Sequence, residues 1–114
     1  MERAPQSFRD FWPYYMSQHQ DPTCRLMHFV GTTLGKLCIV GAFFVSPWLL
    51  LAAPVIGYLF AWIGHFAFEK NKPASWFSAK YAAWSFRGDM KMWRLMVTGR
   101  LGAELKRMSE SSAF

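Results

Sequence analysis

The chain has 114 residues, of which 53% are hydrophobic and 18% are aromatic, and its formal net charge is +6. A soluble domain of this length has too small an interior for so many large side chains. The stretch Leu37–Phe68 contains no Asp, Glu, Lys or Arg, whereas both flanks are basic and aromatic. This pattern is typical of a small integral membrane protein, and because the cations flank an apolar run, no nucleic-acid partner is expected.

The N-terminal segment is predicted to form a short helix over residues 8–20. Ser7 and Asp10 resemble a capping pair at its start, and the Asp-Pro pair at position 21 ends it. One face of this helix carries aromatic residues and a histidine at helical spacing: Phe8, Trp12, Tyr15 and His19.

The uncharged run is too long for a single membrane span. As one helix its 32 residues would measure about 48 Å, against about 30 Å for the hydrocarbon core. Because Pro47 breaks the run, the sequence predicts a helical hairpin with arms over residues 25–45 and 48–68. Lys36, near the middle of the first arm, leaves open whether this hairpin is transmembrane or re-entrant.

The distribution of Lys and Arg predicts the orientation of the hairpin. The turn carries no cation, whereas both flanks are rich in them. By the positive-inside rule both flanks, and with them both termini, are expected on the cytoplasmic side. The membrane would be the bacterial inner membrane or, in a eukaryote, the endoplasmic reticulum.

The C-terminal part is predicted to contain a loop over residues 71–77 and one amphipathic helix over residues 89–108. The tail, residues 109–114, is expected to be frayed. The whole chain, residues 1–114, would form a single all-α domain embedded in the membrane. The predicted helix over residues 89–108 has the profile of a helix that lies on a membrane surface. Its apolar side is made of Met90, Trp93, Val97, Leu101 and Leu105.

The hairpin geometry places two histidines together. His28 lies about as far before the turn as His65 lies after it, so the two should share one level near the cytoplasmic end. Both continue series of small residues, which mark close approach of membrane helices: Gly31 and Gly35 in the first arm, and Ala53, Gly57 and Ala61 in the second. The two imidazoles should therefore face the partner helix, and His19 can reach the same level.

Three convergent histidines suggest a metal site. Iron, zinc and copper all accept imidazole, so the residues alone do not select the metal. Two histidines with a carboxylate form the facial arrangement of non-haem iron oxygenases, and Glu69, one turn after His65, is the nearest carboxylate in sequence. Three histidines would also suffice, and Asp89 is a more distant candidate. Taken singly, each histidine is more often an interfacial or hydrogen-bonded residue than a ligand.

Several segments of the sequence resemble the family of 2-hydroxy fatty acid dioxygenases. The segments are “FWPYYMSQH”, “RLMHFVGTTLG”, “WIGHFAFEKNKPA” and “DMKMWRLMVTGRLGAEL”, and the similarity spans roughly Phe8 to Leu105. The resemblance implies an Fe(2+)-dependent enzyme that uses O2 for α-oxidation of a 2-hydroxy fatty acid to a fatty acid one carbon shorter. It also implies that His19, His28 and His65 are catalytic and bind the metal, with Glu69 and Asn71 in the same motif.

Two functions are therefore weighed. The first is a membrane-embedded iron dioxygenase of lipid metabolism. The alternative is a non-catalytic membrane scaffold or lipid-binding hairpin whose histidines merely pair. A di-iron hydroxylase is disfavoured because such sites need many more histidines than the three in this chain.

Overall fold

Residues 5–110 are described by a computed structural model, and no β-strand occurs within that range. The predicted all-α class is therefore confirmed. The contacts divide the chain into two compact units. The hairpin unit is Gln20–Pro73, and the aromatic unit combines Met1–His19 with Ala74–Phe114. That the two units act as one membrane-embedded domain stays a prediction.

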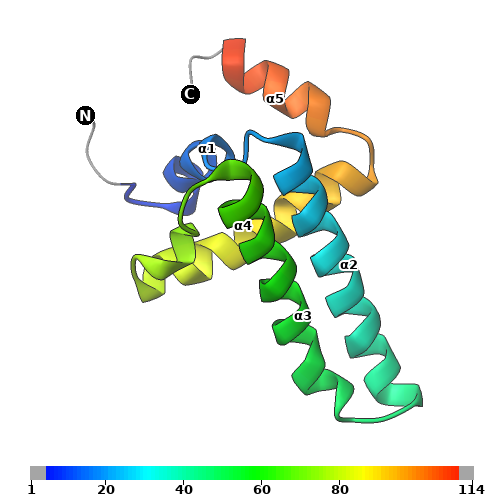
Figure 1. Cartoon of the computed structure of the whole chain (residues 1–114). Helices are drawn as coiled ribbons and strands as arrows, with labels where there is room; N and C mark the ends of the chain where they lie inside the picture. The colour runs from blue at the N-terminus through cyan, green and yellow to red at the C-terminus, as the bar shows by residue number, and fades with distance from the viewer. Residues whose placement is uncertain (1–4, 111–114) are drawn as a thin grey trace. The chain divides into compact units, whose positions relative to one another are not determined.

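The hairpin unit contains the two long apolar helices (Figure 1). Helix α2 spans Pro22–Phe44 and helix α3 spans Leu49–Ile63, and they run antiparallel on either side of a short turn at Pro47. Asp21 caps α2, because its carboxylate accepts the backbone N–H groups of the next turn and Pro at the first helical position needs no acceptor. The predicted hairpin is confirmed, with α2 starting three residues earlier than the sequence indicated.

Small residues allow the two arms to approach closely. A Cβ atom at Gly31 would lie 2.7 Å from the Cβ of Phe60 and 3.2 Å from the carbonyl oxygen of Gly57. At Gly35 it would lie 3.3 Å from the carbonyl oxygen of Ala53. These distances are at or below van der Waals contact, so the glycines are required by the packing, as the small-residue series predicted.

The outer surface of the hairpin is apolar. Phe43, Phe44 and Val45 are 79%, 82% and 81% exposed near the turn, which is unusual for large hydrophobic side chains in water. Two helices, Pro22–Phe44 and Leu49–Glu69, are long and apolar enough to cross a membrane by length and composition. Lys36 is half-buried on α2.

The aromatic unit packs around α1, which spans Phe8–Ser17. The Ser7 hydroxyl accepts the N–H of Asp10 at 3.3 Å, so the predicted cap is confirmed, although the helix ends before residue 20. A short 3₁₀ turn, Ala74–Trp76, precedes helix α4, Ala79–Val97, and helix α5 spans Leu101–Glu110. The buried core comprises Phe11, Trp12, Tyr15, Met16, Ala74, Met92, Leu95 and Met108.

The prediction of one C-terminal helix over residues 89–108 was wrong. Helix α4 begins ten residues earlier, at Ala79, where the Ser78 hydroxyl accepts the N–H of Tyr81 at 3.0 Å. Gly88 lies inside α4, where an added Cβ would meet the Tyr15 ring at 3.1 Å, so the glycine allows the ring to pack against the helix. The chain then turns at Gly99, whose positive φ of 71° suits glycine.

The predicted apolar side of this segment also needs correction. Met92 and Leu95 are buried, whereas Val97 is 52% exposed. Leu101 and Leu105 do pack against the core, but the turn at Gly99 separates their helix from α4, so the five residues do not form one continuous face. Helix α5 extends through Glu110, so residues 109 and 110 of the tail are helical, and residues 111–114 lie outside the described residues.

Candidate metal centre

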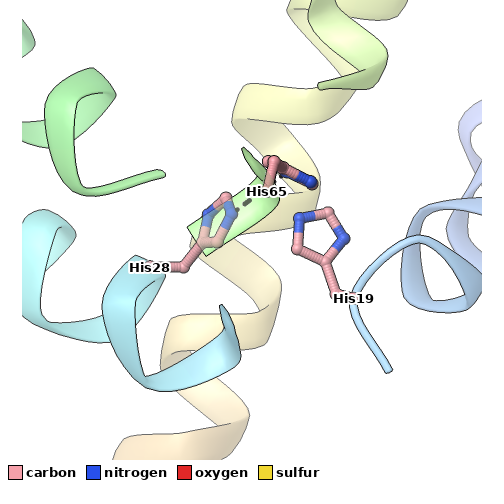
Figure 2. A group of neighbouring side chains, drawn as sticks. All are labelled: His19, His28 and His65. Carbon is pink, nitrogen blue, oxygen red and sulfur yellow. Dashed lines mark hydrogen bonds between the residues drawn. The ribbon is translucent and has the colours of Figure 1, made fainter. Parts of the chain in front are cut away.

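His28 and His65 meet inside the hairpin unit, as the sequence predicted. His28 comes from α2, and His65 follows α3 in the π-helix η1, Gly64–Glu69. Their Nε2 atoms are 3.2 Å apart (dashed line in Figure 2), and the two rings are nearly perpendicular, at 88°. Both side chains are buried, at 7% and 2% exposure.

The close approach of the two helices at this end depends on Gly64. A Cβ atom there would lie 3.1 Å from the Cys24 sulfur and 3.2 Å from the Cys24 carbonyl oxygen. A larger residue at position 64 would push η1 away from α2. Gly64 therefore holds the backbone next to His65 against α2, one turn before His28.

The end of η1 fixes the orientation of the His65 ring. Lys70 takes the left-handed conformation, with φ of 62°, and its N–H donates to the His65 carbonyl. The chain thereby reverses and brings the side chain of Asn71 to His65, where Nδ1–H donates to Oδ1 at 2.7 Å. With the proton on Nδ1, the lone pair of Nε2 faces His28. π-Helical turns of this kind are frequent at functional sites.

Glu69 has a partner that the sequence analysis did not foresee. Its carboxylate accepts the backbone N–H of Asp21, the residue that caps α2. The side chain of Asp21 in turn accepts the N–H of Thr23 at 2.7 Å. Glu69 therefore ties the end of η1 to the start of α2. Sequence spacing suggested a metal ligand here, and nothing in the spacing indicated a bond to position 21.

His19 belongs to the aromatic unit, where it follows α1. Its side chain is 1% exposed and stacks on Tyr15, with ring centroids 4.1 Å apart. Its Nδ1–H donates to the Tyr15 carbonyl at 2.6 Å, which leaves Nε2 as the lone-pair nitrogen. Figure 2 draws His19 together with the two histidines of the hairpin unit. Asp89, the remaining candidate, lies half-buried on α4 in the aromatic unit.

The comparisons with known proteins agree with the resemblance noted from the sequence. The model of the family described as 2-hydroxy-palmitic acid dioxygenase Mpo1-like matches residues 5–101. The chain belongs to this family. The matched range contains all three histidines, together with Glu69 and Asn71. Searches of curated proteins and of solved structures found no match.

The name of the Mpo1-like family suggests a type of reaction and a class of substrate. It describes a dioxygenase and a substrate that carries a 2-hydroxyl group on a fatty acid. It therefore suggests an enzyme of lipid oxidation, in accord with the exposed apolar surface of the hairpin unit.

Proposed function

We propose that this Mpo1-like protein is an Fe(2+)-dependent dioxygenase that performs α-oxidation of a 2-hydroxy fatty acid at a membrane. The metal would be held by His19, His28 and His65, and the product would be a fatty acid one carbon shorter. The observation that carries the proposal is the pair of buried Nε2 atoms of His28 and His65, 3.2 Å apart. The family description supports the substrate class.

The spacing of the pair fits two ligands of one ion. Metal–nitrogen bonds of about 2.1 Å place two ligands about 3.0 Å apart at octahedral angles and about 3.4 Å apart at tetrahedral angles. The observed separation of 3.2 Å lies between these values. The spacing therefore admits either coordination geometry, and the choice of iron rests on the family.

The hydrogen bonds of two histidines also fit metal ligation. Metal-binding histidines characteristically donate their other ring N–H to a carboxylate, carbonyl or similar oxygen. His65 does so to Asn71 and His19 does so to the Tyr15 carbonyl. In both residues Nε2 is thereby the nitrogen available to a metal, and all three histidines are buried residues that each offer one ligand atom.

The chain connectivity supports His19 as the third ligand. Asp21 is held at the end of η1 by Glu69, and η1 carries His65. His19 precedes Asp21 by two residues, so their Cα atoms are at most about 7.6 Å apart. This short connection supports His19 as the third ligand, which is the role that the family resemblance implies.

The remaining residues of the proposed site would bind and orient the acid. When bound, Fe(2+) supplies the redox chemistry and the open coordination positions that activation of O2 requires. Lys70 and Lys72 are exposed next to η1 and would attract the substrate carboxylate electrostatically. The apolar outer face of α3 would accommodate the alkyl chain, and burial of the histidines would keep bulk water from the reacting carbon.

Replacement of each histidine by alanine tests the proposal. Each variant should lose most of its bound iron and its conversion of a 2-hydroxy fatty acid, measured by metal analysis and by mass spectrometry of the shortened product. Phe86→Ala, at an exposed position of α4 that has no role in the proposed site, is the control and should retain both. Full iron and full activity in all three histidine variants would refute the proposal.

Glu69→Ala separates ligation from positioning. Glu69 accepts the N–H of Asp21, so its loss should displace the backbone near the histidines without removing a metal ligand. This variant should therefore retain more iron than His65→Ala and should convert substrate more slowly than the unmodified chain. Loss of iron as complete as in His65→Ala would instead assign Glu69 as a metal ligand.

A non-catalytic scaffold is the second candidate, because the same distance also allows a direct hydrogen bond between the two histidines. At 3.2 Å, the Nε2–H of His28 can donate to the Nε2 of His65 without any metal. Metal content of protein purified without chelator distinguishes the two, with about one iron per chain for the enzyme and none for the scaffold.

A further inference from the structure

The aromatic unit contains a basic pocket that the proposed dioxygenase site does not use. Residues of α1, α4 and α5 line an open surface pocket of about 800 Å³. Five cationic side chains line it: Arg9, Arg87, Lys91, Arg94 and Arg107. Within residues 5–110, no carboxylate is among its lining residues. The four arginines are exposed, so solvent screens their mutual repulsion, and a bound anion would reduce it further.

The cations of the pocket are only partly compensated by the protein. Arg107 forms a bidentate pair with Glu104, with distances of 2.7 and 3.1 Å. Arg87 and Lys91 lie over aromatic rings, 4.3 Å from the Phe8 centroid and 4.4 Å from the Trp12 centroid. Cation–π contacts position these groups without neutralising them.

The lowered pKa of Lys91 agrees with an excess of positive charge in the pocket. Burial lowers the pKa of Lys91, and the neighbouring Arg107, Arg94 and Arg87 lower it further, against an opposing effect of Glu104. An anion in the pocket would remove this repulsion.

We propose that the basic pocket binds the phosphate group of an anionic phospholipid. Guanidinium groups match phosphate oxygens with paired hydrogen bonds, and four of the five lining cations are arginines. The pocket, of about 800 Å³, is open on one side, so it leaves room for a headgroup with its glycerol as well as for the phosphate itself. Phe8, Trp12 and Met108 also line the pocket and would contact the apolar part of the lipid.

Calorimetric titration of the full chain in a neutral detergent tests this site, and it needs no iron. Short-chain phosphatidic acid should bind at least about tenfold more tightly than phosphatidylcholine of the same chain length, whose headgroup also carries a cation. The double variant Arg87→Gln/Arg94→Gln should weaken binding of phosphatidic acid by about tenfold or more, since each charged hydrogen bond contributes substantially.

The control changes the net charge equally outside the pocket. Arg100→Gln/Lys106→Gln removes two cations of α5 and its preceding turn that do not line the pocket, and it should bind phosphatidic acid like the unmodified chain. Should the double variant fail to fold by circular dichroism, Arg94→Gln alone, at an exposed position, should still weaken binding several-fold.

Inorganic phosphate distinguishes the source of the ligand. If it binds as tightly as phosphatidic acid, the pocket is a phosphate site with a soluble ligand. If neither binds, or if the control variant loses as much affinity as the double variant, the proposal is overturned. Because none of these readouts depends on the histidines, failure here leaves the proposed dioxygenase untouched.

Discussion

Asn71 is the residue that sets the tautomer of His65. Its Oδ1 accepts from Nδ1 at 2.7 Å, and this bond directs the Nε2 lone pair toward His28. Asn71→Ala removes the acceptor and should lower iron affinity by about 10- to 100-fold, which is typical when the partner of a ligating histidine is lost. Competition with a chelator measures the affinity.

Asn71→Asp is the informative companion, because it retains an oxygen at the same position. It should retain most of the iron affinity that Asn71→Ala loses. Equal affinities for Asn71→Ala and the unmodified chain would show that this hydrogen bond does not tune the site.

At the residue scale the sequence predicted which histidines meet but not what orients them. Nearly equal distances from the turn at Pro47 and the small-residue series sufficed to place His28 opposite His65. The contact of Asn71 depends on the left-handed turn at Lys70, and a lysine gives no sequence signal for that conformation. The bond between Glu69 and Asp21 joins residues 48 positions apart, so local spacing could not indicate it.

At the scale of elements, the α2–α3 contact predicts unequal effects of two glycine substitutions. Gly31→Ala would bring its Cβ to 2.7 Å from the Phe60 Cβ and should destabilise the hairpin by about 1–3 kcal/mol. Gly57→Ala meets nothing closer than the Gly31 carbonyl oxygen at 4.0 Å, so it should be neutral or stabilising by up to about 1 kcal/mol. Denaturation in detergent measures both, and equal losses would contradict this packing.

The contact between α1 and α5 predicts a pH dependence of the aromatic unit. The Trp12 Nε1–H donates to the Glu104 carboxylate at 2.9 Å. Hydrogen bonding by Arg107, and secondarily by Trp12, lowers the pKa of Glu104 below its ordinary value of 4.5, against the opposing effect of burial. Because the folded state favours the ionised form, this contribution to stability is present above pH 4.5 and is lost as the pH falls through the lowered value.

Glu104→Gln tests that dependence. The variant should unfold at a lower temperature than the unmodified chain at neutral pH, and the difference should shrink on acidification below pH 4.5. Gln can still accept from Trp12 but cannot pair with Arg107 as an anion. A difference in unfolding temperature that is constant over the acidic range would contradict the assignment.

The sequence predicted the elements unevenly, for physical reasons. The hairpin was predictable because a charge-free run longer than one span must fold back at its proline. The start of helix α4 was misplaced, because Gly88 lies inside the helix where it accommodates the Tyr15 ring, a contact between residues far apart in the sequence that local spacing does not indicate. The π-helical form of η1 was not predictable, since the periodicity of apolar residues over so short a segment does not separate a π-turn from an α-turn.

At the scale of the whole molecule, the length of α2 favours a hairpin that crosses the membrane fully. Its 23 residues extend about 35 Å, which exceeds the hydrocarbon core of about 30 Å. Lys36 lies eight residues before the end of α2, or about 12 Å along its axis. From there the flexible stem can direct the ammonium toward the distal interface, which lowers the cost of its charge.

Cysteine labelling in intact cells tests this topology in a variant with Cys24 and Cys38 replaced by alanine. Val45→Cys, at the exposed turn, should react only with a reagent applied from outside, because the charge-free turn crosses to the far side. Gly102→Cys, at an open position of α5, should react only after the cells are permeabilised, since the basic flanks remain on the cytoplasmic side. Protection of Val45→Cys from both sides would indicate a re-entrant hairpin. Labelling of Gly102→Cys from outside would show that the orientation is the opposite of the predicted one.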